Sequence, residues 1–135
     1  MFLFDTDILS NILKKNPSPA LLRRIAIIPS DQQFTSTITV GEMIYGAYKS
    51  GRPSYFLEKL DKLVLPNVNI LSFDEASAYT YGKLRAEIEK EGTPLTEPDL
   101  RIASIAITYN LTIVSGNVRH FSKIPGLKIE NWIEE

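Results

Sequence analysis

The chain begins with a short apolar run that ends on two carboxylates and leads directly into a helical pattern. Residues 1–4 are apolar throughout, and Asp5 and Asp7 follow one residue apart. The next apolar residues recur at the spacing of an amphipathic helix: Ile8, Leu9, Ile12 and Leu13. A strand that ends on acid and turns into a helix is how an α/β protein places charge at the edge of its sheet. The opening therefore predicts an α/β fold with an acidic sheet edge.

The rest of the chain repeats the alternation of strand and helix. Further strands are predicted at 34–39, 68–73, 111–115 and 127–130. Helices are predicted at 20–28, 39–49, 55–66, 74–90 and 96–109, with a short helical piece ending at Phe121. The stretch Gly92-Thr93-Pro94 is a predicted break. Alternating elements favour parallel pairing, so we expect a three-layer α/β/α sandwich in a single domain, residues 1–135.

Composition excludes several classes of protein. A length of 135 residues suits one domain with a real core, and an apolar fraction of 44% is ordinary for a globular protein. No apolar run approaches the roughly 20 residues that span a bilayer, and no basic segment precedes the apolar N-terminus. The chain has no cysteine, which excludes disulfides and thiolate metal sites. We therefore expect a cytoplasmic protein without a membrane segment.

The net charge of −1 does not suggest a protein that holds nucleic acid by bulk electrostatics. An acidic site that recruits metal ions would itself lower the net charge, so this exclusion is weak. Local basic clusters remain available for phosphate contacts: Lys14-Lys15, Arg23-Arg24, Lys49 with Arg52, and Arg119-His120 with Lys123.

Four polar positions carry the chemical argument: Asp5, Glu42, Asp99 and Asn117. Each also has an ordinary explanation as a helix cap. Two stretches fit the capping-box pattern, Thr39-x-x-Glu42 and Thr96-x-x-Asp99. Asp5 and Asn117 each precede a predicted helix, where Asp and Asn are favoured caps. Taken singly, these residues leave capping and ligand binding both open.

Parallel strands change this balance, because all of them end at the same edge of the sheet, where ligands bind. Asp5, Asn117 and the predicted first turn holding Glu42 all follow strand ends. The helix of Asp99 starts at that edge if strand 111–115 is parallel to the first strand. The loop 91–96 has to carry the chain there, and six extended residues span at most ~20 Å.

Carboxylates crowded at one edge raise one another's pKa unless a cation lies between them. Oxygen ligands without cysteine, and with a single histidine, select hard ions such as Mg²⁺ or Mn²⁺. Such an ion activates water and neutralises charge on phosphorus, which is the equipment for phosphodiester hydrolysis. The acidic residues therefore predict a metal-dependent nuclease.

At these residues the chain resembles a PIN-domain ribonuclease, specifically a VapC-type toxin of a toxin–antitoxin pair. The similar stretches run nearly end to end: 4–9, 39–47, 81–85 with 92–95 and 99–103, 113–121, and 124–132. Asp5, Glu42 and Asp99 fall at the acidic positions of the family motifs. Asn117 falls where the wider PIN family often has Asp and where some VapC-like chains have Asn.

The resemblance implies an endoribonuclease, dependent on Mg²⁺ or Mn²⁺, that stops translation by cutting tRNA or ribosomal RNA. Asp5, Glu42 and Asp99 would bind the metal, and Asn117 would complete the catalytic set. Supporting contacts are expected from Thr6, Asp7 and Ser115, and RNA contacts from Arg101, Arg119 and His120. For His120 we favour a solvated or phosphate-facing side chain over a general base, since the sequence identifies no partner for it.

The resemblance also implies partners, a homodimer and a VapB-type antitoxin that blocks the acidic pocket. The antitoxin would need an apolar groove, for which we expect Ile12, Leu13, Leu21, Leu22, Tyr45, Phe56 and Leu60. These residues are also explained by ordinary core packing, because helices that face a sheet need an apolar stripe.

Three alternatives remain. A phosphoacceptor signalling domain has a similar fold, but it needs an Asp at the end of a middle strand, and the middle strands end near Thr39 and Phe73. A PIN fold without catalysis would be an RNA-binding or regulatory module. A PIN nuclease that processes RNA would share the whole acidic set without being a toxin.

Overall fold

A five-stranded, wholly parallel sheet organises the protein, in the order β3-β2-β1-β4-β5. The computed structural model describes residues 1–92 and 95–134. The strands are β1 Phe2–Phe4, β2 Gln33–Ser36, β3 Asn69–Leu71, β4 Thr112–Val114 and β5 Ile129–Glu130. Leu3 lies opposite Phe34 of β2 and Ile113 of β4, so β1 is central. All five predicted strands are confirmed, although each of them is shorter than predicted.

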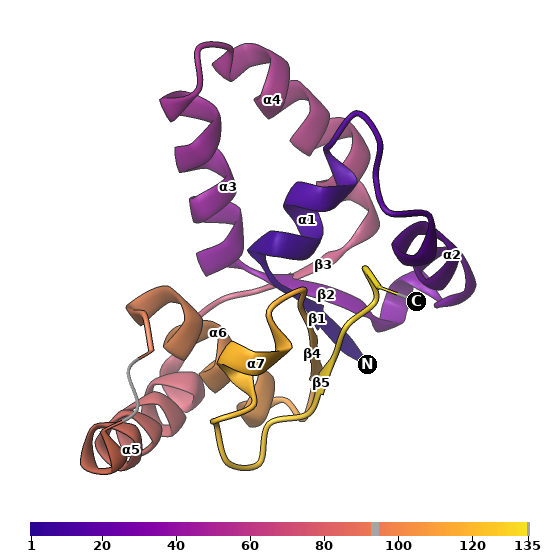
Figure 1. Ribbon diagram of the computed structural model, residues 1–135. Coiled ribbons are helices and arrows are strands. Elements are labelled where there is room, and N and C mark those ends of the chain that lie inside the picture. The colour runs from indigo at the N-terminus through magenta and orange to yellow at the C-terminus, as the bar shows by residue number, and fades with distance from the viewer. Residues whose placement is uncertain (93–94, 135) are drawn as a thin grey trace.

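Helices cover both faces of this sheet, as Figure 1 shows. Helices α5, α6 and α7 lie below the sheet in that view, and α1, α2 and α4 lie above it. Their bounds are α1 Thr6–Ile12, α2 Pro19–Ile27, α3 Thr37–Lys49, α4 Pro53–Lys59, α5 Glu75–Glu91, α6 Glu97–Thr108 and α7 Val118–Phe121. The predicted three-layer α/β/α sandwich is therefore confirmed.

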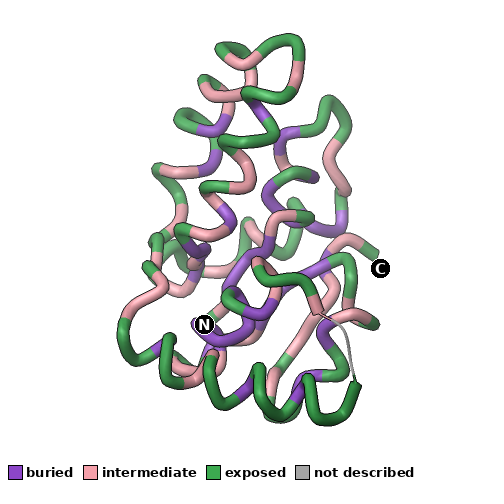
Figure 2. Tube along the Cα trace, turned by 90° about the vertical axis from the view of Figure 1, so that its left-hand side faces the viewer, coloured by how far each residue is buried: buried purple, intermediate pink, exposed green. Residues whose placement is uncertain are grey.

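Alternation along the central strands divides the core into two halves. Leu3 and Ile113 pack against α5 and α6, whereas Phe4 and Val114 pack against α1 and Trp132. Successive strand residues point to opposite faces, so two neighbours serve two cores. Figure 2 shows buried residues along the strands and exposed ones on the outer turns of the helices. The buried apolar character of β4 on both faces, expected from its sequence, is thus confirmed.

Helix ends are fixed by local capping, and here one prediction is wrong. Asp74 accepts a hydrogen bond from the backbone N–H of Ser77 at 2.9 Å, and Gly92 ends α5 in a left-handed conformation, φ 70°. Both agree with the sequence; residues 93–94 of the predicted break lie outside the described residues. The cap of α3, however, is Ser36 and not Thr39: the Ser36 hydroxyl accepts from the Thr39 N–H at 3.1 Å.

The predicted helix at 55–66 is three consecutive pieces. Helix α4 begins at Pro53, continues into a π-helical segment, Leu60–Val64, and ends in a 3₁₀ turn, Leu65–Asn67. The wider turn of the π segment keeps Leu60 and Val64 buried in the upper core. Above the sheet, helices α3 and α4 lie side by side next to α1.

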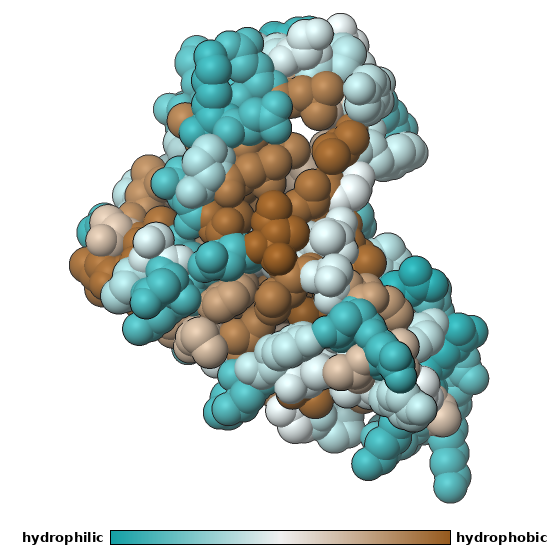
Figure 3. All heavy atoms as spheres, turned by 180° about the vertical axis from the view of Figure 1, so that it is seen from behind, coloured by the Kyte–Doolittle hydropathy of each residue, from teal (hydrophilic) through white to brown (hydrophobic). Residues whose placement is uncertain are grey.

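Apolar side chains also gather across the middle of the rear face, shown in Figure 3. A cavity of about 350 Å³ lies among α2, β2 and residues 63–68. Its lining includes Ile25 and Val64, which belong to the upper half of the core. Within the described residues, no helix combines the length and apolar character needed to cross a membrane.

Candidate active site

An acidic pocket of about 200 Å³ opens where β1 and β4 end. Its lining residues are Asp5, Thr6, Asp7, Glu42, Asp99, Asn117 and Phe121. Strands β2 and β3 follow β1 on one side of the sheet, and β4 and β5 lie on its other side. The order of the strands therefore reverses between β1 and β4. Open α/β sheets bind their ligands at such a switch point, outside the carboxyl ends of the strands. The four predicted positions thus lie together at the predicted edge.

Asp5 is both the cap of α1 and the floor of the pocket. It directly follows β1, and its Oδ1 accepts a hydrogen bond from the backbone N–H of Ile8 at 3.1 Å. Its side chain is buried, with 4% of the residue exposed. The two interpretations left open by the sequence are therefore compatible, because one carboxylate oxygen is enough to cap the helix.

Burial raises the pKa of Asp5 to about 7, from an ordinary value of 3.8. Loss of water is the main cause, and the negative charges of Asp7 and Asp99 add to it. Hydrogen bonds from the Ser115 side chain and the Ile8 backbone oppose the shift by favouring the charged form. The pocket is therefore a place where an ionised carboxylate needs a positive partner.

Glu42 lies in the second turn of α3, not in the first turn as predicted, because the helix begins at Thr37. The Oγ1 hydroxyl of Thr6 donates a hydrogen bond to Oε1 of Glu42 at 2.6 Å. This bond joins α1 to α3 across 36 positions in sequence. Thr6, predicted as a supporting residue, thereby fixes the Glu42 carboxylate at the side of the pocket.

Asp99 is held by two donors on one of its oxygens. Thr96 caps α6, as the sequence predicted, and its Oγ1 donates to Oδ2 of Asp99 at 2.9 Å. Nε2 of His120 lies 2.9 Å from the same Oδ2. The His120 side chain is 27% exposed, so the imidazole is largely enclosed and is turned toward an acid of the pocket. The sequence identified no orienting partner for His120, and the structure places its ring against Asp99.

Asn117 stands at the N-terminal end of α7, but its side chain makes no capping hydrogen bond. Its backbone N–H donates instead to Oγ of Ser115, which is fully buried, at 2.9 Å. The Ser115 hydroxyl therefore connects the end of β4 to Asn117, and it also acts to lower the pKa of Asp5. Asn117 lines the acidic pocket, and its side chain is not used to cap α7.

The other predicted residues differ in their placement. Asp7 is exposed and lines the pocket rim, and Arg119 is exposed on α7. Arg101 is turned elsewhere: its Nε lies 3.4 Å from Oε2 of Glu97, and its guanidinium lies over the rings of Phe73 and Tyr81. Arg101 belongs to a surface network that joins α5 and α6, and it does not line the acidic pocket.

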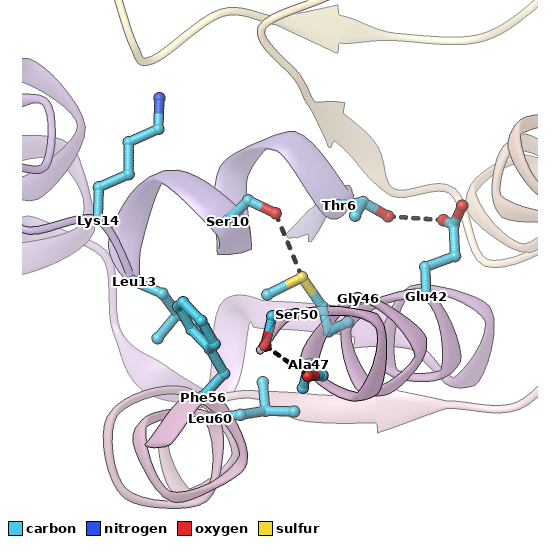
Figure 4. A pocket seen from close by; sticks show the side chains of 11 residues that line it. Thr6, Ser10, Leu13, Lys14, Glu42, Gly46, Ala47, Ser50, Phe56 and Leu60 are labelled. Atoms are coloured by element: carbon cyan, nitrogen blue, oxygen red, sulfur yellow. Dashed lines mark hydrogen bonds between the residues drawn. The ribbon is translucent and has the colours of Figure 1, made fainter. Parts of the chain in front are cut away.

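A larger groove of about 430 Å³ adjoins the acidic pocket, between α1, α3 and α4 (Figure 4). Leu13, Phe56 and Leu60 form its apolar side, as predicted for a groove, and Ser10 donates a hydrogen bond to the sulfur of Met43 within it. Thr6 and Glu42 line both this groove and the acidic pocket.

The other residues predicted for this groove lie elsewhere. Ile12 and Leu22 line the cavity among α2, β2 and residues 63–68, and Leu21 is fully buried in the core. Tyr45 is 65% exposed on α3.

The donor set of the acidic pocket consists of oxygen atoms, which suits a hard divalent cation. Among residues 1–92 and 95–134, no three acidic or histidine side chains already surround a common point closely enough to hold an ion. Mg²⁺ is usually bound by one or two carboxylates and keeps several waters, so a looser arrangement still fits it. The buried Asp5 beside Asp99 is the pair that such an ion would satisfy.

Comparison with known proteins identifies the family of the chain. Residues 2–127 match the model of the PIN domain. The chain is 33% identical over 132 residues to "Ribonuclease VapC2" of Rickettsia felis, covering 98% of both chains. It is 33% identical over 131 residues to "tRNA(fMet)-specific endonuclease VapC" of Salmonella typhimurium, covering 97% of both.

The fold agrees equally well with a solved structure. One chain in the crystal structure of VapBC2 from Rickettsia felis, bound to a DNA fragment from their promoter, superimposes on this chain with a TM-score of 0.90. That match has 32% identity and covers 97% of this chain and 98% of the other. On the strength of the domain match and of these full-length relatives, the chain belongs to the PIN-domain family, in its VapC ribonuclease branch.

Proposed function

We propose that this protein is a divalent-metal-dependent endoribonuclease and the toxin of a VapBC pair. One observation carries the proposal: Asp5 at the end of β1, Glu42 on α3 and Asp99 on α6 line one pocket at the switch point of the sheet. A relative of nearly equal length bears the name of a tRNA(fMet)-specific endonuclease, so we propose tRNA as the substrate class. Its action on translation would take place in the cytoplasm.

Asp5, Glu42 and Asp99 would hold Mg²⁺ or Mn²⁺ through their carboxylates. When bound, the ion activates a water and neutralises the charge that develops on the phosphate. The chain's own groups prepare the pocket for this. Thr6 orients Glu42, and the Ile8 N–H holds Asp5.

The amide of Asn117 makes no capping hydrogen bond, so it would be available to donate to a phosphate oxygen of the RNA. We propose that Arg119, exposed one residue past the start of α7, contacts a neighbouring phosphate. Phosphate contacts of this kind position the backbone of the RNA without reading its sequence.

The antitoxin, we propose, occupies the groove between α1, α3 and α4. Solved structures of related chains are complexes of VapBC, so a partner of this class is expected here. The groove is largely apolar, carries Lys14 at its rim and ends at Glu42. A segment lying in it would therefore meet the wall of the acidic pocket. A homodimer is proposed as well, for which exposed apolar residues of α3 such as Ile44 and Tyr48 offer surface.

The test is cleavage of total RNA and of purified tRNA by the full chain with Mg²⁺ or Mn²⁺. Asp5→Asn and Asp99→Asn are the matched variants, because Asn keeps the size of Asp and the oxygen that accepts the capping bond. We expect cutting by the wild type alone, and loss of cutting with EDTA. Equal cutting by the wild type and both variants would refute a metal site built on Asp5 and Asp99. No cutting by any of the three proteins would refute the nuclease and favour a silent RNA-binding module.

The toxin and RNA-processing functions differ in their biological partner. A toxin gene has a small antitoxin gene beside it, and co-expression of that neighbour would restore growth that this protein arrests. A processing enzyme would cut RNA in the same test but would leave growth unaffected. This comparison separates the two without changing the chemistry of the site.

A further inference from the structure

We propose that His120 is a positioning residue for Asp99: it holds Oδ2 so that Oδ1 alone is presented to a divalent cation. The proposal rests on the metal-dependent function proposed above, and it concerns how one ligand of that site is oriented.

Both hydrogen bonds to the Asp99 carboxylate fall on Oδ2. The Thr96 hydroxyl donates to it at 2.9 Å, and Nε2 of His120 lies at 2.9 Å from it. An ionised carboxylate only accepts hydrogen bonds, so the imidazole donates through Nε2. Within residues 1–92 and 95–134, no side chain or backbone donor is bonded to Oδ1. The carboxylate thus has one occupied oxygen and one open oxygen.

The imidazole is itself held in place by the short helix α7. Phe121, the next residue, is 1% exposed and anchored in the lower core, and it also lines the acidic pocket. The backbone N–H of His120 donates to the carbonyl of Asn117 at 3.1 Å. The same short helix therefore brings Asn117 to the pocket and aims His120 at Asp99. A ligand-orienting residue needs this kind of rigid support.

Glu42 has the same arrangement. Its Oε1 accepts the hydrogen bond from Thr6 at 2.6 Å, and no described donor is bonded to Oε2. Two carboxylates on different helices each have one oxygen tied to a protein donor. Repetition of the arrangement at two of the proposed ligands indicates that the pocket is built for carboxylates that bind through one oxygen.

The number of oxygens offered affects which ion is favoured. Mg²⁺ is small and demands near-octahedral geometry, whereas Ca²⁺ readily accepts both oxygens of a carboxylate. Mn²⁺ takes the same hard oxygen ligands as Mg²⁺ and is convenient to measure. With His120 bonded to Oδ2, Asp99 offers a single oxygen, which suits the small ions. Without that bond, Asp99 could offer both oxygens, which would suit Ca²⁺ better. His120 should thus raise Mn²⁺ affinity and sharpen the preference for Mn²⁺ over Ca²⁺.

Binding of MnCl₂ and CaCl₂ to the full chain, measured by calorimetry without RNA, tests this. His120→Phe keeps the ring without the donor, and His120→Ala serves if the larger ring disturbs folding. His120→Gln restores an N–H donor near the position of Nε2. Lys123→Ala, an exposed change two residues after α7 ends, is the matched control. Thermal unfolding of each metal-free variant reports on the structural role separately.

We expect His120→Phe and His120→Ala to weaken Mn²⁺ binding about 10- to 100-fold, the usual cost of losing an outer hydrogen bond to a ligand. Ca²⁺ binding should fall less, His120→Gln should recover most of the Mn²⁺ affinity, and Lys123→Ala should match the wild type. Equal Mn²⁺ affinity in the wild type and both donor-free variants overturns the role of His120 and leaves the metal site intact. Failure of the wild type to bind Mn²⁺ overturns both proposals.

Discussion

Oγ1 of Thr6 and Oε1 of Glu42 are 2.6 Å apart, and their hydrogen bond joins the first turn of α1 to the second turn of α3. Thr6 follows Asp5 directly, so the bond also sets Glu42 in relation to the acid on the pocket floor. It is a side-chain bond to a carboxylate, which is stronger than one between neutral groups. The geometry of the acidic pocket depends on it in a way that substitution can measure.

Replacing Thr6 with Val should reduce RNA cleavage while the protein stays folded. Val keeps the branched shape and removes the hydroxyl, so the Glu42 carboxylate loses its donor. We expect a fall of about 10- to 100-fold in rate at limiting Mg²⁺, partly recovered at high Mg²⁺. Thr6→Ser retains the donor and is the control. An unchanged rate in Thr6→Val would mean that Glu42 needs no orientation.

The stability of the metal-free protein should depend on the ionisation of Asp5. Its pKa is raised from 3.8 in the unfolded chain to about 7 in the folded protein. Below pH 3.8 the carboxyl of Asp5 is protonated in both states, so its ionisation does not change the free energy of unfolding. As the pH rises to about 7, the unfolded chain releases the proton first, so the folded state loses stability, on the order of 4 kcal/mol in all.

Asp5→Asn removes this titration and keeps the oxygen that caps α1. With EDTA present, we therefore expect the variant to be about as stable as the wild type near pH 4 and increasingly more stable toward pH 8. Urea unfolding of both proteins at several pH values measures the difference directly. Saturating Mn²⁺ should reverse the order at pH 8, since a cation favours the ionised Asp5. A constant difference between the two proteins across this pH range would contradict the prediction.

Gly46 and Gly41 offer a matched pair for locating the antitoxin. Both lie on α3, and a Cβ added at either meets no atom within 4 Å. Gly46 lines the groove between α1, α3 and α4, and Gly41 does not. Leu at position 46 should partly fill the groove and weaken antitoxin binding at least tenfold. Leu at position 41 should bind as the wild type does, as measured by competition or calorimetry. Equal affinities in the two variants would exclude the groove as the docking site.

The capping of α3 gives a stability prediction. Ser36→Ala removes the side-chain acceptor for the N–H of Thr39 and should lower the free energy of unfolding by about 1 kcal/mol. Thr39→Val should cost less, since the Thr39 hydroxyl accepts only a longer bond from Ser36, at 3.3 Å. Urea denaturation of the two variants distinguishes the caps. A larger loss of unfolding free energy for Thr39→Val than for Ser36→Ala would instead identify Thr39 as the cap, as the sequence pattern suggested.

The sequence predicted the architecture well because its signals are local. Apolar runs, breakers such as Pro66, and caps such as Asp74 and Thr96 mark where elements start and stop. The gathering of Asp5, Glu42 and Asn117 followed from the rule that parallel strands end at one edge. Asp99 joins them only because the loop before α6 returns the chain to that edge, which the sequence allowed but did not require. The start of α3 was misplaced because Ser36 and Thr39 are both good caps, and the β-branched residues between them suit a strand equally well.

What the sequence did not predict are contacts between distant side chains. His120 and Asp99 are 21 positions apart, and their pairing depends on how α7 packs through Phe121. Arg101 looked available for RNA two residues after Asp99, but Glu97 and the rings of Phe73 and Tyr81 hold it elsewhere. Local patterns carry no information on such pairings, because several partners lie within reach of a long side chain.

The acidic pocket and the apolar groove share one wall, formed by Thr6 and Glu42. An occupant of either side that shifts this wall changes the free energy of binding on the other. Such coupling is reciprocal by thermodynamic necessity. The bound metal would change the affinity for the antitoxin by the same factor by which the bound antitoxin changes the affinity for the metal. The concentration of divalent ions in the cell would then affect the antitoxin concentration at which the complex dissociates.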